Sequence, residues 1–128
     1  MNRRVVLAFV ADAVLVVVFA VIGRASHDEA VLGPGGSGLL QTSWPFLVAL
    51  VAGWLVTLAW RQPFVPVRTG LGVWSITIIG GMLLRVASGQ GTALAFVIVA
   101  SVSLLVLLVG WRVAVSAVTR QRARRVVD

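Results

Sequence analysis

The chain has 128 residues, of which 59% are hydrophobic and only 12% are charged, and its mean hydropathy is +1.03. A soluble domain of this size needs far more polar surface, so the composition excludes an ordinary soluble protein and indicates a membrane protein. Cysteine is absent and His27 is the single histidine, which excludes disulfides, thiolate chemistry and a multi-histidine metal site within one chain.

The first apolar run covers residues 5–23 and follows the basic segment MNRR. It is long for the hydrophobic region of a signal peptide and contains a carboxylate, Asp12, so we expect a membrane span that is retained. The segment 24–43 contains GPGGSG and is expected to be a flexible surface loop.

Three further apolar runs follow, at 44–60, 71–87 and 92–113. Each is long enough as a helix to cross a hydrocarbon core of ~30 Å, the run at 71–87 only barely. Ser43 is expected to cap the second run, with Pro45 in its first turn. Short connections between the later runs predict antiparallel neighbours. The sequence therefore predicts an all-α fold, a four-transmembrane-helix bundle of antiparallel up-down hairpins.

Glycines within the runs have a packing interpretation. Gly53 in the second run and the pair Gly80-Gly81 in the third are expected to allow close approach of two helices, as small residues do in membrane bundles.

The basic residues are all arginine, and their distribution predicts an orientation. Two of the eleven, Arg24 and Arg85, fall on one side of the predicted bundle. The other nine fall on the opposite side: Arg3, Arg4, Arg61, Arg68, Arg112, Arg120, Arg122, Arg124 and Arg125. This asymmetry predicts that both termini are cytoplasmic, with residues 114–128 as a basic tail. The net charge of +7 is then a topology signal, and the expected partner is the lipid bilayer and not a nucleic acid.

Asp12 is the one acidic residue inside a predicted span. Counting 1.5 Å per residue places it ~10 Å inside the core, where a charge costs at least ~2.5–3.5 kcal/mol. We therefore expect Asp12 to face the bundle interior, either protonated or hydrogen-bonded to Thr77, Ser103 or Trp54. It is then an interhelical clamp worth ~0.6–2 kcal/mol, or a proton or cation site. Asp12→Asn is expected to preserve the fold under both hypotheses.

A second polar group is expected at the outer rim of the bundle, formed by Arg24, His27 and Arg85. Arg24 and His27 are three residues apart, and Arg85 ends the third span. Two guanidinium groups and an imidazole can hold a carboxylate or a phosphate. The alternative is a collar in which the arginines contact lipid headgroups or pair with Asp28 and Glu29.

The pattern D-x6-F-x3-G-R-x2-H, from Asp12 to His27, occurs together with WPF in the second run and GGMLLR in the third. This combination resembles a family of small four-helix bacterial membrane proteins that is catalogued as a domain of unknown function. The resemblance implies a four-helix integral membrane protein and supplies no activity. We expect this protein to lie in the bacterial inner membrane. No nucleotide-binding, metalloprotease or hydrolase motif is present, so we expect no enzyme, metal site or cofactor.

Two functions remain open from the sequence. The first is an accessory or structural membrane component that packs with partner proteins or with itself, as a parallel homo-oligomer. The second is a small oligomeric transporter or channel that uses Asp12 as an intramembrane proton or cation site. A polar cavity that reaches Asp12 would favour transport, whereas a filled interior would favour the structural role.

Overall fold

The computed structural model describes residues 2–26 and 32–127, and in these ranges the chain is helical with no strand. The four long helices are α1 (Arg3–Ser26), α2 (Ser37–Thr57), α3 (Leu71–Ala87) and α4 (Leu94–Val127). Shorter 3-10 turns lie at Pro34–Gly36 and Ala59–Arg61, and a π-helical turn precedes α3 at Pro66–Gly70. Four helical segments are long and apolar enough to cross a membrane, which confirms the expected all-helical class.

The start of α2 differs from the prediction. A glycine-rich turn, in which Gly35 and Gly36 have φ values of 61° and 82°, leads directly into α2 at Ser37. The prediction of a flexible loop that reaches residue 43 was therefore wrong, and so was the prediction that Ser43 caps the helix. Ser43 lies inside the helix, where its Oγ donates a hydrogen bond to the Leu39 carbonyl at 2.8 Å.

The end of α2 also differs from the predicted run, which continued to Trp60. Leu58 has a φ of 54°, in the left-handed region, and the helix therefore ends at Thr57. Trp60 lies in the 3-10 turn that follows. α3, in contrast, has the bounds of the predicted run at 71–87.

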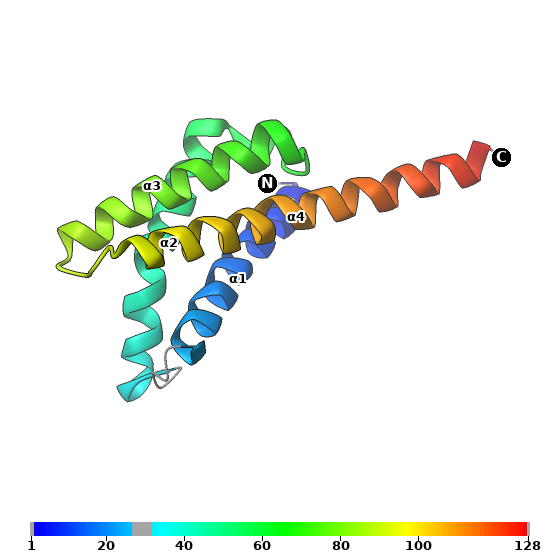
Figure 1. Cartoon of the computed structure of the whole chain (residues 1–128). Coiled ribbons are helices and arrows are strands. Elements are labelled where there is room, and N and C mark those ends of the chain that lie inside the picture. Colours follow the sequence, from blue (N-terminus) through cyan, green and yellow to red (C-terminus); the bar gives the residue numbers. More distant parts are fainter. Residues whose placement is uncertain (1, 27–31, 128) are drawn as a thin grey trace.

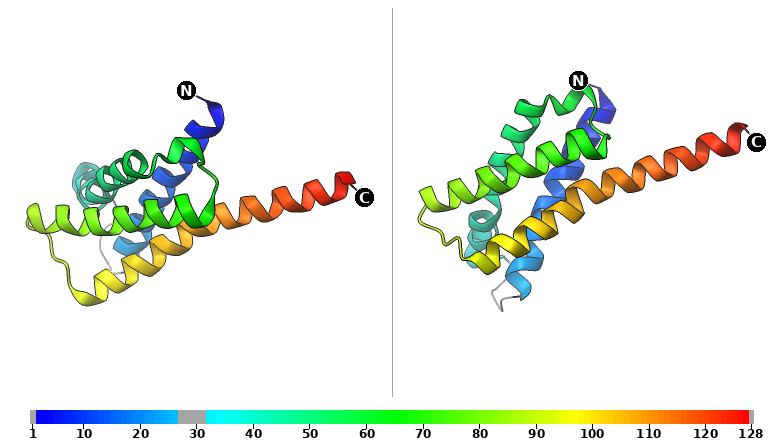
Figure 2. Two further views of the ribbon diagram at one scale, coloured as in Figure 1. Left: turned by 90° about the horizontal axis from the view of Figure 1, so that it is seen from above. Right: turned by 45° about the horizontal axis from the view of Figure 1, so that its top comes forward.

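α4 is much longer than the run predicted at 92–113. Residues 114–127, expected only as a basic tail, continue the same helix, because no glycine or proline interrupts it. Its 34 residues span ~51 Å at 1.5 Å per residue, well beyond a hydrocarbon core of ~30 Å. Figures 1 and 2 show the C-terminal part of α4 extending away from the other helices.

α2 and α3 approach each other closely along a line of small residues. A Cβ atom added at Gly81 would lie 2.5 Å from Cδ1 of Phe46, and one added at Gly80 would lie 3.0 Å from Cβ of Ala49. At Gly53 the added atom would lie 3.3 Å from a backbone oxygen of α3. Side chains at these positions would push the helices apart, so the predicted packing role of the three glycines is confirmed.

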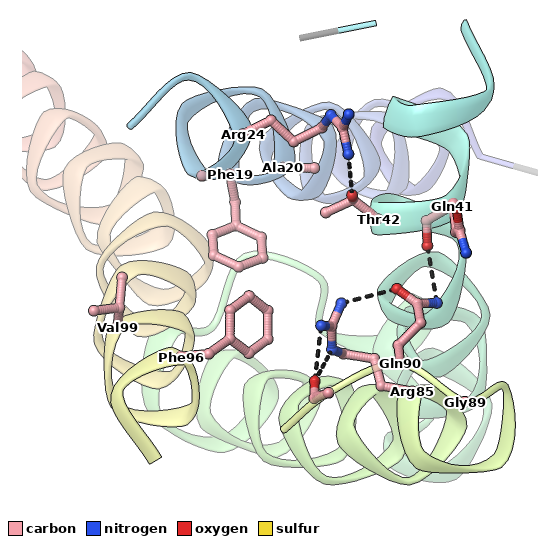
Figure 3. A pocket seen from close by; sticks show the side chains of 12 residues that line it. Phe19, Ala20, Arg24, Gln41, Thr42, Arg85, Gly89, Gln90, Phe96 and Val99 are labelled. Atoms are coloured by element: carbon pink, nitrogen blue, oxygen red, sulfur yellow. Dashed lines mark hydrogen bonds between the residues drawn. The ribbon is translucent and has the colours of Figure 1, made fainter. Parts of the chain in front are cut away.

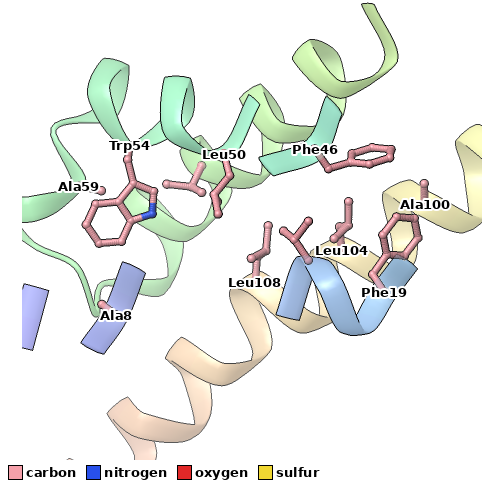
Figure 4. Close-up of a cluster of buried hydrophobic side chains, with 11 residues drawn as sticks. Ala8, Phe19, Phe46, Leu50, Trp54, Ala59, Ala100, Leu104 and Leu108 are labelled. Atoms are coloured by element: carbon pink, nitrogen blue, oxygen red, sulfur yellow. The ribbon is translucent and has the colours of Figure 1, made fainter. Parts of the chain in front are cut away.

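Most of the core lies where α1, α2 and α4 meet, and Figure 4 shows side chains from these three helices converging there; α3 contributes the buried Val73. One layer of the core is aromatic: Phe19 packs edge-to-face on Phe46 with a ring-centroid separation of 5.4 Å. The ring centroids of Phe46 and Phe96 lie 6.3 Å apart. The neighbouring layer is aliphatic and has no exposed surface; it contains Val16, Leu50, Leu104 and Leu108. Aromatic contacts and filled aliphatic space thus separate the two polar groups described next.

Candidate functional site

Asp12 lies in the first half of α1 and has no exposed surface. Its carboxylate accepts two hydrogen bonds from Arg112, Nη1 to Oδ1 at 2.8 Å and Nη2 to Oδ2 at 2.7 Å. The indole Nε1 of Trp111 donates to Oδ1 at 2.8 Å, and that of Trp54 donates to Oδ2 at 2.8 Å. A bidentate ion pair and two indoles therefore supply two donors to each carboxylate oxygen. We call these four residues the buried clamp.

Arg112 is held as firmly as the carboxylate that it binds. It also has no exposed surface, and its Nε donates to the Pro63 carbonyl at 2.8 Å while Nη1 donates to the Leu108 carbonyl at 2.8 Å. Gly70 makes room for its stem, since a Cβ there would lie 3.3 Å from Cδ of Arg112. The guanidinium thus joins α1, α4 and the connection before α3.

Aromatic rings surround the buried clamp. Phe9 packs edge-to-face on Trp54 at 5.3 Å between centroids, and Phe64 packs in the same way on Trp111 at 5.7 Å. The Arg112 guanidinium carbon lies 4.6 Å from the centre of the Trp111 ring. These contacts keep the ion pair away from both water and lipid, which strengthens its electrostatic attraction.

The structure brings together only some of the residues proposed around Asp12. Asp12 lies inside the bundle, and Trp54 is one of its partners. The two other residues offered as alternative hydrogen-bond partners, Thr77 and Ser103, were predicted wrongly. The Thr77 hydroxyl is buried without a hydrogen-bond partner among the described residues, and Ser103 makes no bond to Asp12. The depth count took residue 113 as the end of the fourth helix, whereas α4 continues to Val127 and Arg112 lies beside Asp12.

Sequence reasoning missed Arg112 and Trp111 as functional residues. Arg112 was assigned to the nine cytoplasmic arginines, because an arginine directly after an apolar run usually marks the end of a membrane span. Two signals point to its actual role. A lone carboxylate in a span needs a cation, and Arg112 is followed by the apolar residues Val113, Ala114 and Val115, so the apolar stretch does not end at it.

A second site is a cavity of about 450 Å³ at the other end of α1. We call it the arginine pocket, because Arg24 from α1 and Arg85 from α3 both line it (Figure 3). The start of α2 contributes Gln41 and Thr42 to its wall, and Nη1 of Arg24 donates to Oγ1 of Thr42 at 3.1 Å. His27, the third residue expected at this rim, lies outside the described residues.

Arg85 is fixed in the wall of the arginine pocket. Its Nε and Nη2 donate to the Gly91 carbonyl at 3.0 and 2.8 Å, and Nη1 donates to Oε1 of Gln90 at 3.1 Å. Its guanidinium carbon lies 4.2 Å from the centre of the Phe96 ring at the start of α4. Gln90 in turn donates from Nε2 to the Gln41 carbonyl at 3.1 Å, which ties the α3–α4 connection to α2.

The described residues form an all-helical fold with four helices long and apolar enough to cross a membrane and with a buried ion pair. These features fit a multi-pass membrane protein. Residues 9–115 match the model of a family described as a protein of unknown function (DUF3054), and the chain belongs to that family. This confirms the resemblance noted in the sequence. The matched range includes the buried clamp and the arginine pocket. Comparison with curated proteins and with solved structures gave no match.

Proposed function

We propose that this chain is a non-enzymatic structural or accessory component of the bacterial inner membrane, with a fixed bundle that packs with itself or with partner proteins. The observation that supports this proposal is the closed shell around Asp12. A carrier carboxylate must exchange its ligands with water, protons or ions during transport. Here protein donors occupy both oxygens, and neither member of the ion pair has exposed surface.

The chemistry of the buried clamp suits a fixed structural contact better than a site that opens and closes during transport. Removing one partner of a buried ion pair typically costs ~3–5 kcal/mol, because the other charge is left buried without compensation. The clamp joins α1, α2 and α4, together with the connection that contains Pro63. Three helices and a connection therefore lose favourable contacts at once if the pair opens.

We further propose that consecutive helices are antiparallel and that both termini are cytoplasmic. Contacts between α1 and α2 support this arrangement: Asp12, in the first half of α1, meets Trp54 near the end of α2, and Arg24 near the end of α1 meets Thr42 near the start of α2. The burial of Arg112 changes the arginine asymmetry only slightly, since nine minus this one residue leaves eight against two.

A flux assay distinguishes this proposal from transport through Asp12. Full-length protein is reconstituted in vesicles that contain a pH-sensitive dye, and proton and alkali-cation gradients are applied. We expect the wild type to show the same flux as Asp12→Leu/Arg112→Met, a variant that replaces the ion pair by apolar side chains. Flux in the wild type that this variant loses would contradict the structural role and support a proton or cation site at Asp12.

A further inference from the structure

We propose that the arginine pocket binds the phosphate or carboxylate group of an amphiphilic anion. The site is separate from the buried clamp, and the inference goes beyond the proposed structural role. It rests on the charge of the pocket walls, on the fixed geometry of Arg85 and on the apolar surface beside it.

The charge of the walls has one sign. Among the described residues that line the cavity, two are arginines and none is acidic. Gln41, Thr42 and Gln90 add neutral polar groups to the same walls. Guanidinium groups bind carboxylate and phosphate through charge-assisted hydrogen bonds, which are about twice as strong as neutral ones. An anion is therefore the ligand that these walls suit.

The geometry of Arg85 differs from that of an arginine that extends flexibly to lipid headgroups. A guanidinium has about five N–H donors. Three are used by the Gly91 carbonyl and the Gln90 amide, and the face of the group lies over Phe96. Among the described residues, one donor on each of Nη1 and Nη2 has no partner, so two N–H groups of a fixed guanidinium are available for oxygen ligands.

Arg24 is placed on the opposite wall by a close approach to α2. A side chain at Gly38 would overlap with Nη2 of Arg24, so glycine at this position lets the guanidinium lie against the helix. From there Arg24 reaches Thr42 and lines the same cavity as Arg85. The two cations come from α1 and α3, which makes the pocket a meeting point of separate helices.

The remaining walls indicate what the anionic group is attached to. Phe19, Phe96 and Val99 present apolar surface to the same cavity (Figure 3). A volume of about 450 Å³ is far larger than one phosphate requires and lies in the usual range for small-molecule sites. A phosphate or carboxylate that carries an apolar group would use both kinds of wall. Such a molecule is either an anionic lipid or a soluble aryl or alkyl anion.

The test uses the full chain, purified and delipidated in a neutral detergent, with calorimetric titration of two probes. Phosphatidylglycerol in mixed micelles represents the lipid source, and phenyl phosphate represents the soluble source. Each is titrated into the wild type, Arg24→Gln, Arg85→Gln and Phe96→Ala. Arg122→Gln, in the exposed C-terminal part of α4, is the control with the same change of charge.

At least one probe should bind the wild type and the control equally, and bind either pocket-arginine variant about tenfold or more weakly, as expected for the loss of a charge-assisted hydrogen bond. Phe96→Ala should also weaken the binding of that probe. The probe that responds identifies the source. If Arg85→Gln does not fold, Arg24→Gln gives the same comparison. Equal affinity in all variants, or no binding of either probe to the wild type, would overturn the proposal.

Discussion

Asp12→Asn should destabilise the bundle more than removal of both charges does. Sequence alone predicted that this substitution preserves the fold, because an amide still forms hydrogen bonds. The ion pair reverses that expectation, since the Arg112 guanidinium would stay fully buried without a counter-charge. We expect a loss of ~3–5 kcal/mol for Asp12→Asn and a similar loss for Arg112→Met.

A double-mutant cycle separates this ion-pair effect from general loss of packing. Asp12→Leu, Arg112→Met and the double variant are unfolded from mixed micelles by increasing SDS, with helix content followed by circular dichroism. The double variant should lose less stability than either single variant, so its loss should fall short of the sum of the single losses by at least ~3 kcal/mol, the upper end of the range found for residues in one network. Arg122→Gln serves as the control and should change stability little. Single losses that simply add, within ~0.5 kcal/mol, would refute the reasoning.

The remaining predictions concern the neighbours of the clamp, the helix contact and the topology. Trp111→Phe should lower the free energy of unfolding by ~1.5–3 kcal/mol in the same SDS assay, because it removes a hydrogen bond to a charged group. Trp60→Phe, at an exposed side chain, should lower it much less. Gly81→Ala should cost ~1–3 kcal/mol through overpacking, and unchanged stability would contradict the close contact of α2 and α3. Single cysteines at Ser37 and Ser116 should label from opposite sides of the membrane, and labelling of both from outside would refute the topology.

The helices were predictable because a lipid environment requires long apolar runs, and four such runs are visible in the sequence. Their ends were less predictable. The end of α2 depends on a left-handed leucine, Leu58, which no local pattern announces. The continuation of α4 to Val127 is compatible with helix propensity, but arginine-rich segments after a span are equally compatible with an irregular tail.

The candidate sites were predictable to a different extent. Burial of Asp12 follows from the cost of a charge in lipid, which depends on depth alone. Its main partner does not follow, because the position of Arg112 relative to Asp12 depends on the placement of a helix about 100 residues later in the chain. For the arginine pocket, residue spacing placed Arg24 and Arg85 at the same end of the bundle, but only tertiary packing decides that they line one cavity.

Exchange of the indole N–H protons measures most directly whether the centre of the bundle is closed. With ¹⁵N-labelled tryptophan, the five indole signals are assigned by single substitutions, and their decay is followed by NMR after transfer to D₂O. The Trp54 and Trp111 signals should persist far longer than the Trp60 signal, because their N–H groups are bonded to Asp12 inside the protein while Trp60 is exposed. Exchange of Trp54 and Trp111 as fast as that of Trp60 would show that water reaches Asp12, and would contradict a closed structural clamp.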